Sequence, residues 1–128
     1  MNANEENEIA HQVVDVAYHL HQALGPGLLE SAYEAVLSHE LQKRGLHVAR
    51  QVLLPVLFDS VRVDAGYRID LLVEDKVIVE LKSVEALVPV HQKQLLTYLR
   101  LADKRLGLLI NFGDPLFKRA VKRVVNGL

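Results

Sequence analysis

Apolar residues recur at helical spacing in four parts of the chain and predict four helices. The first carries Ile9, Val13 and Val16 on one face and ends at the Gly25-Pro26-Gly27 break. The second runs from about residue 28 to 44, and Gly45 ends it. The predicted third helix covers residues 91–103 after Pro89, and the last one follows Asp114-Pro115.

Between these helices the pattern changes to alternation and to short apolar runs, which are typical of strands. Residues 48–58 predict a strand that Pro55 restricts to an edge position or a bulge, with a turn at Asp59-Ser60. Residues 61–64 return, Ala65-Gly66 forms a bend, and a hairpin of residues 67–73 and 77–82 follows. The apolar run 106–112 predicts a strand buried on both faces and reached by a crossover. We therefore predict an α/β fold whose mixed sheet, an antiparallel meander plus a crossover strand, is flanked by helices.

Length and composition are those of one globular domain covering residues 1–128. Half of the residues are hydrophobic and about a quarter are charged. Residues 1–7 are polar and without periodicity, so we expect a disordered terminus there. No apolar run has the length of a membrane span and no secretory signal is visible, so the expected location is cytoplasmic.

Charge and cysteine content limit the chemistry. The net charge of -1 provides no overall attraction to nucleic-acid phosphates, although a local cluster could still bind them. Since the chain has no cysteine, any metal must be held by oxygen or imidazole ligands.

Three charged residues stand out in the predicted hairpin, where Asp70, Glu80 and Lys82 share the face opposite its apolar side chains Tyr67, Ile69, Leu71 and Val73. The three-residue loop 74–76 places Asp70 directly opposite Glu80, at a Cβ separation of about 5 Å. Two carboxylates so close repel each other and favour a cation between them. The group could hold a hard divalent ion and position a water for attack, or it could be a solvated strand end with an ion pair.

Three further groups are candidates, each with a simpler structural alternative. Glu30 is the third residue of its helix if Gly27 is the N-cap, where a carboxylate also favours the helix dipole. Gln94 and Tyr98, at i and i+4, could reach a phosphate together or could form an ordinary helix edge. A basic face on the last helix could bind nucleic acid or simply be solvated, and it comprises Lys118, Arg119, Lys122 and Arg123.

Three motifs carry a resemblance to a known group of enzymes. Asp70, followed after nine residues by Glu80-Leu81-Lys82, resembles the metal-binding motif of the PD-(D/E)XK nuclease superfamily, with Ile69 in place of its proline. The stretch from Gly27 to Tyr33 resembles the signature of the bacterial GxxExxY family, which belongs to that superfamily. Gln94-x-x-x-Tyr98 resembles a motif that follows Glu-x-Lys in its exonuclease-type branches.

The resemblance implies a restriction-endonuclease-like core and a Mg²⁺-dependent nuclease acting on DNA or RNA, with Mn²⁺ as an alternative metal. Asp70, Glu80 and the Leu81 carbonyl would hold the ion, with Glu30 as an outer ligand. Lys82 would position the attacking water, and Gln94 and Tyr98 would brace Lys82 or contact the phosphate. A module that binds nucleic acid or protein without cutting is the alternative, and a homodimer is left open.

Overall fold

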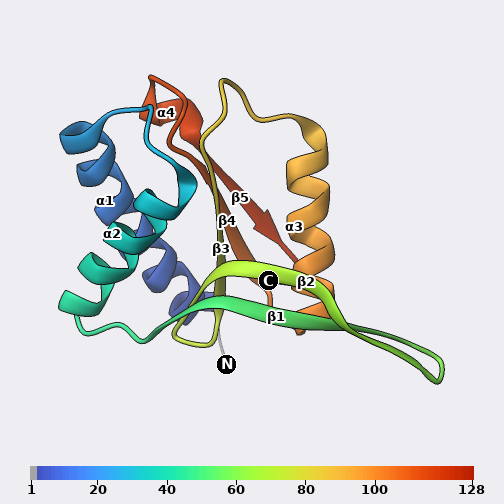
Figure 1. The fold of residues 1–128 in the computed structure, drawn as a ribbon. Coiled ribbons are helices and arrows are strands. Elements are labelled where there is room, and N and C mark those ends of the chain that lie inside the picture. The colour runs from blue at the N-terminus through green and yellow to red at the C-terminus, as the bar shows by residue number, and fades with distance from the viewer. Residues whose placement is uncertain (1–2) are drawn as a thin grey trace.

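The computed structural model describes residues 3–128 as four helices and five strands (Figure 1). In chain order the elements are α1 Ala3–Leu24, α2 Glu30–Lys43, β1 Val48–Phe58, β2 Val61–Val73, β3 Val77–Lys82, α3 Pro89–Ala102, β4 Leu106–Asn111, α4 Phe117–Ala120 and β5 Val121–Val125.

The strands form one mixed sheet in the order β1-β2-β3-β4-β5. The pairs β1/β2, β2/β3 and β4/β5 are antiparallel, whereas β3 and β4 are parallel and are connected through α3. A parallel neighbour needs such a crossover, because the chain must return to the same end of the sheet. The predicted α/β fold with a meander and a crossover strand is confirmed.

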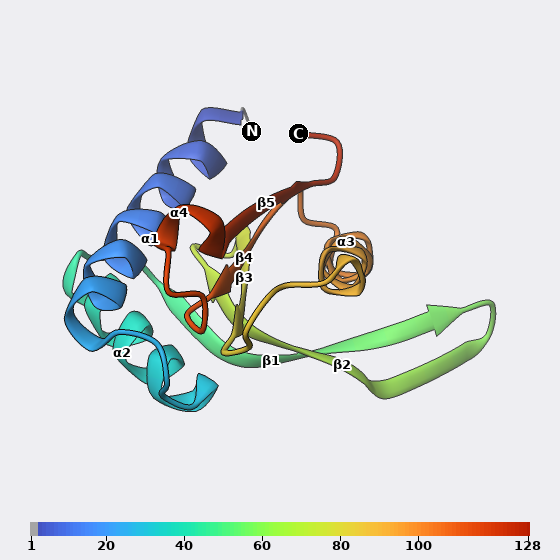
Figure 2. The ribbon, with the colours of Figure 1, turned by 90° about the horizontal axis from the view of Figure 1, so that it is seen from above.

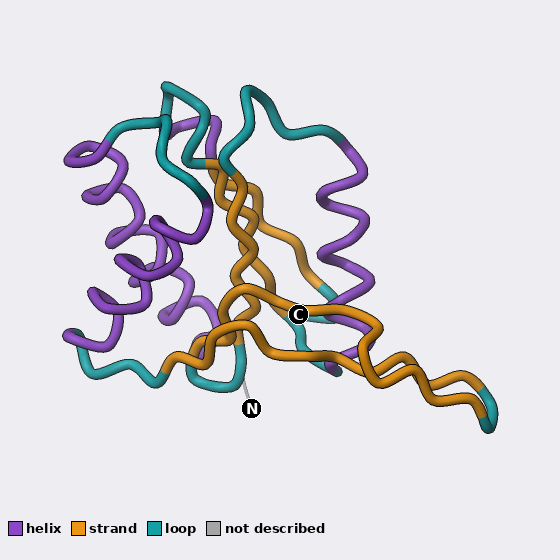
Figure 3. The backbone as a smooth tube through the Cα atoms, viewed as in Figure 1, coloured by secondary structure: helices purple, strands orange, loops and turns teal. Residues whose placement is uncertain are grey.

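Helices cover both faces of the central strands. Figures 1 and 3 show α1 and α2 on one side of the sheet and α3 on the other. Strand β3 accordingly contributes to two cores: Val77, Val79 and Leu81 pack on the side of α1 and α2, while Ile78 packs with Leu95 of α3. Strand β4 is buried along its whole length, as its continuous apolar run predicts.

Strands β1 and β2 form a long ribbon that leaves the body of the protein and extends past α3 (Figure 2). The pairing register shifts between Leu54 and Val56, so Pro55 occupies both an edge strand and an irregularity, as predicted. Opposite it, Gly66 leaves no room for a side chain, since a Cβ there would lie 2.5 Å from Val56 Cγ2. At the outer end of the ribbon, Phe58 is 74% exposed.

Strand β2 does not keep strict alternation along its length, because the side of the sheet on which its apolar side chains pack changes at one point. Leu71 packs on the side of α1 and α2, but Ile69, two residues earlier, packs on the side of α3. The change falls beside Gln51, whose φ of 52° is in the left-handed region that few residues other than glycine adopt. The prediction that Ile69 and Leu71 share one face is therefore wrong, and Asp70 lies at the turn.

The amino-terminal segment is helical, so the predicted disorder of residues 3–7 is wrong, while residues 1–2 lie outside the described part. Helix α1 begins at Ala3, and Glu6 is only 1% exposed. Its Oε2 accepts a hydrogen bond of 2.8 Å from Arg105 Nε, next to β4. This ion pair attaches the first turns of α1 to the body, which a scan for apolar periodicity overlooks because the anchoring residue is charged.

The carboxyl-terminal helix is also predicted wrongly, because α4 has one turn and β5 follows at once. Val121, Val124 and Val125 are β-branched, and they extend along the open edge of β4. Lys122 and Arg123 are successive strand residues, so their side chains point to opposite sides of the sheet.

The four basic residues Lys118, Arg119, Lys122 and Arg123 consequently do not form one helical face. Arg119 Nη2 lies 3.1 Å from Asp114 Oδ1, and Arg123 Nη2 donates to Asn7 Oδ1. Across residues 3–128, no helix combines the length and apolar character that a membrane span requires.

Candidate active site

Asp70 and Glu80 lie opposite each other where β2 and β3 pair. In the β2–β3 hairpin Leu71 pairs with Val79 and Val73 with Val77, so the connecting loop has three residues, 74–76, as predicted. Continuing this antiparallel register by one residue places Asp70 opposite Glu80. The Asp70 backbone N–H donates to Glu80 Oε1 at 3.1 Å, and the Leu81 N–H donates to Asp70 Oδ2 at 2.8 Å. Each carboxylate thus bonds to the backbone of the other strand, so the two are held close together.

The electrostatics of this pair are unfavourable without a cation. Glu80 is 8% exposed, and its burial, together with the nearby Asp70 charge, raises its pKa to about 8. The Asp70 N–H and the Lys82 charge act in the opposite direction and do not cancel the effect. Among the ion pairs formed within residues 3–128, none includes Asp70 or Glu80. At neutral pH the pair therefore retains a proton.

Two residues that the sequence analysis did not select complete the surroundings of Asp70. Gln51 Nε2 donates to Asp70 Oδ1 at 3.3 Å and also to Glu34 Oε1. Glu34 is buried and accepts hydrogen bonds of 3.1 and 2.9 Å from Nε and Nη2 of Arg50. The Gln51 amide nitrogen thus bridges Glu34 and Asp70, and Glu34 is itself held by the ion pair with Arg50. Glu34 could have been found because it lies one turn after Glu30 on the same helix face.

Glu30 reaches the same region from α2, though not at the predicted helix position. The N-cap is Leu29 rather than Gly27, which makes Glu30 the first helical residue. It lies with Asp70 along a cleft of about 480 Å³ between α2 and the β1–β2 ribbon, whose lining also includes Ser31, Glu34, Gln51 and Arg68. Glu30 is exposed, so it is available to water or a ligand in this cleft.

On the other side of the pair, Lys82 ends β3 and Tyr98 projects from α3. Lys82 is half-buried, and its charge lowers the Glu80 pKa. Burial raises the pKa of Tyr98, with smaller contributions from Glu80, Tyr67 and Asp70. The Tyr98 ring contacts Tyr67 at a centroid distance of 5.0 Å. Gln94 is exposed one turn earlier and makes no hydrogen bond with Asp70, Glu80 or Lys82, all of which belong to the described chain.

A family model matches most of the chain. The family model described as PD-(D/E)XK nuclease superfamily matches residues 7–124. This chain belongs to the PD-(D/E)XK nuclease superfamily. No curated protein and no solved structure matches it. Membership in the narrower GxxExxY family stays a prediction.

The donor set of this PD-(D/E)XK domain fits a hard divalent cation in part. Asp70, Glu80 and the Leu81 carbonyl offer only oxygen, and the repulsion between the two acids is the kind that a cation relieves. Throughout residues 3–128, no three histidine or acidic side chains are close enough together to hold a metal. Glu30 is therefore not gathered with the pair as a third direct ligand. Mg²⁺ normally keeps several waters, so two carboxylates and a carbonyl are a sufficient protein contribution.

The tyrosine of the predicted GxxExxY signature has a structural role in this superfamily member. Tyr33 stacks on Phe112 with ring centroids 4.3 Å apart. Its hydroxyl donates to the Gly25 carbonyl and accepts a hydrogen bond of 3.2 Å from the Leu28 N–H. Tyr33 thus fixes the loop before Glu30 and packs against Phe112, which directly follows β4.

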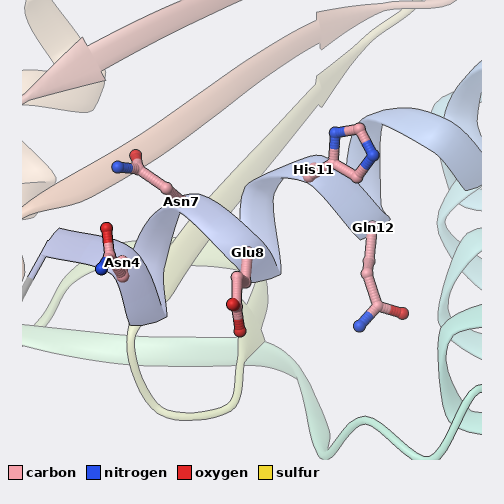
Figure 4. Close-up of a pocket in the computed structure, with 5 residues that line it drawn as sticks. All are labelled: Asn4, Asn7, Glu8, His11 and Gln12. Atoms are coloured by element: carbon pink, nitrogen blue, oxygen red, sulfur yellow. The ribbon is translucent and has the colours of Figure 1, made fainter.

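A second depression lies along α1, away from the motif residues of the superfamily. Figure 4 shows the side chains that line it, which are Asn4, Asn7, Glu8, His11 and Gln12. They all come from one helix, and only one carboxylate and one imidazole are among them. We assign this depression no catalytic role.

Proposed function

We propose that this protein is a metal-dependent nuclease that hydrolyses phosphodiester bonds of DNA or RNA. One observation supports this most strongly: Glu80 is buried next to the half-buried Asp70, neither acid has an ion-pair partner among residues 3–128, and the Glu80 pKa is raised to about 8. Lys82 follows Glu80 two residues later on β3. A structural ion pair would lower the pKa of its acid, so a raised pKa favours a cation site. Membership in the nuclease superfamily agrees with this interpretation.

In this proposal Asp70, Glu80 and the Leu81 carbonyl hold Mg²⁺ or Mn²⁺. When bound, the metal lowers the pKa of a coordinated water and neutralises charge on the phosphate. Lys82, at the end of β3, orients the water and offsets negative charge that develops on the phosphate oxygens. Gln51 keeps Asp70 oriented, as its hydrogen bond indicates.

The remaining predicted residues take supporting roles. Glu30 anchors water in the cleft from the first turn of α2. The Tyr98 hydroxyl, which lies within the electrostatic influence of both acids, contacts the phosphate or Lys82. Gln94 joins it only if the exposed amide turns toward bound substrate. The proposal does not use the basic residues of α4 and β5.

The test is a cleavage assay on single-stranded, double-stranded and branched DNA and on RNA, each with Mg²⁺, with Mn²⁺ and with chelator. We expect cleavage of at least one substrate with metal and none with chelator. Lys82→Ala should abolish cleavage while nucleic-acid binding is retained or only weakened. If Lys82→Ala cuts as fast as wild type, the role given to Lys82 is wrong.

A binding module without catalysis is the second candidate, because the net charge is only -1 and many basic side chains are held in ion pairs. It predicts that nucleic acid or a protein binds to the purified chain and that no substrate is cut with any metal. The same assay separates the two candidates.

A further inference from the structure

Arg68 lies on β2 two residues before Asp70 and lines the same cleft. Residues two apart on a strand have their Cα atoms about 7 Å apart, so the two side chains start close together. Ile69 between them is fully buried, whereas Arg68 is exposed and lines the cleft together with Asp70. Arg68 therefore shares this cleft with Asp70, one member of the acid pair.

The cleft would be strongly acidic without Arg68. Its lining contains Glu30, Glu34 and Asp70, and of these Glu34 is neutralised by Arg50. Arg68 is the cleft's own cation. A substrate that carries negative charge needs such a cation to enter an acidic cleft.

Arg68 is also available, which is not usual among the arginines of this protein. Ion pairs hold Arg44, Arg50, Arg62, Arg105 and Arg119. Arg68, by contrast, is exposed and forms neither an ion pair nor a side-chain hydrogen bond with any residue that the structure describes.

Asp70 would be its obvious partner, but the Asp70 oxygens are already engaged. Oδ2 accepts from the Leu81 N–H, and Oδ1 accepts from Gln51 Nε2. Both Asp70 oxygens thus accept hydrogen bonds from other donors, and the Arg68 guanidinium remains available to a ligand. An arginine fork matches a phosphate group bidentately, which makes this the chemistry that such a side chain recognises best.

We propose that Arg68 binds a backbone phosphate of the nucleic acid in the cleft between α2 and β2, adjacent to the phosphate at the Asp70–Glu80 pair. The inference rests on the proposed nuclease function, since it takes the ligand class from it. It makes Arg68 a substrate-binding residue that acts before the chemical step. Its effect is therefore expected in binding and in KM, with a smaller effect on kcat.

The experiment compares Arg68→Gln and Arg68→Lys with a matched control, Arg62→Gln. Arg62 lies on the same strand and is exposed, but its guanidinium is paired with Asp64. Binding of fluorescent single-stranded and duplex oligonucleotides is measured in chelator over a range of salt concentrations, so that cleavage does not interfere. Thermal melts verify that each variant is folded.

We expect Arg68→Gln to weaken binding about tenfold and to reduce the slope of log K against log salt by about 1. Arg68→Lys should keep the slope but recover only part of the affinity, because it retains the charge without the fork. Arg62→Gln should change neither quantity. Equal affinity and slope for Arg68→Gln and wild type would overturn the inference.

The outcome is distinguishable from failure of the proposed function. If no substrate is cleaved with any metal but Arg68→Gln still shows weaker binding and a smaller salt slope, the proposed catalysis is wrong and the phosphate site is supported. If wild type cleaves and Arg68→Gln leaves the affinity, the salt slope and KM unchanged, the phosphate site is wrong and the nuclease function is supported. If wild type binds no nucleic acid, both are overturned.

Discussion

Replacing Glu80 by Gln removes the buried ionisable group while it preserves the side chain's shape. The Gln oxygen can still accept the hydrogen bond that the Asp70 N–H donates to Glu80 Oε1. What the substitution eliminates is the ionisation of a side chain whose pKa, raised chiefly by burial and then by Asp70, is about 8. The variant therefore tests the electrostatic strain of the site without creating a cavity.

The sign of the effect follows from proton binding. In the unfolded chain Glu80 ionises near its ordinary pKa of 4.5, but in the folded protein it keeps its proton up to about pH 8. Between these values the folded state binds more protons, so the contribution of Glu80 to stability is complete below the lower value and is lost as pH rises through the upper one. At about 1.4 kcal/mol per pH unit, the loss from pH 5.5 to pH 8 is on the order of 3 kcal/mol.

The assay is urea unfolding of wild type and Glu80→Gln in chelator at several pH values from about 5.5 to 8.5. We expect similar free energies of unfolding at the acidic end and a variant more stable by a few kcal/mol at the alkaline end. Other groups that titrate in both proteins cancel in the difference. A difference that does not change with pH would refute the inferred strain, and with it the main support for a cation site.

Three further substitutions test separate parts of the structure. Asp70→Asn should leave the free energy of unfolding in chelator unchanged or higher by about 1 kcal/mol, and millimolar Mg²⁺ should raise the melting temperature of wild type but not of this variant; equal responses to Mg²⁺ would contradict the assignment. Gln51→Gly relieves the left-handed backbone but deletes the amide next to Asp70, so calorimetric titration should show Mg²⁺ affinity reduced by about tenfold with the fold intact; unchanged affinity would remove Gln51 from the site. Phe58→Ser, at the exposed end of the ribbon, should shift the free energy of unfolding by less than about 0.5 kcal/mol in urea melts, and a larger loss would mean that this end packs against something.

Much of the fold can be predicted because local patterns and long-range packing agree. The β2–β3 hairpin is an example: the loop length alone determines that Asp70 and Glu80 face each other. The crossover to β4 follows from an apolar run that is too short for a helix and too apolar for an exposed strand. In both cases the spacing of side chains determines which surfaces can be buried.

The errors arise where a tertiary partner decides the structure. Ala120, Val121 and Val124 are spaced for a helix, but the unpaired edge of β4 makes the strand more favourable. Glu6 anchors α1 through Arg105, 99 residues away, which no local pattern contains. Gln51 was missed for a similar reason. Its role depends on a left-handed backbone conformation, and a glutamine in a strand sequence gives no sign of one.

The hydrogen bonds that tie Asp70 and Glu80 to the opposite strands offer a way to detect cation binding at the site. The backbone amides of Asp70 and Leu81 donate to carboxylate oxygens of the site. A cation that draws those oxygens toward itself weakens the same two bonds, so occupancy of the site and closure of this end of the hairpin are coupled. Amide chemical shifts and hydrogen-exchange rates at these two positions, compared with those at Val79 farther along the strand, therefore follow cation binding directly, with no substrate required.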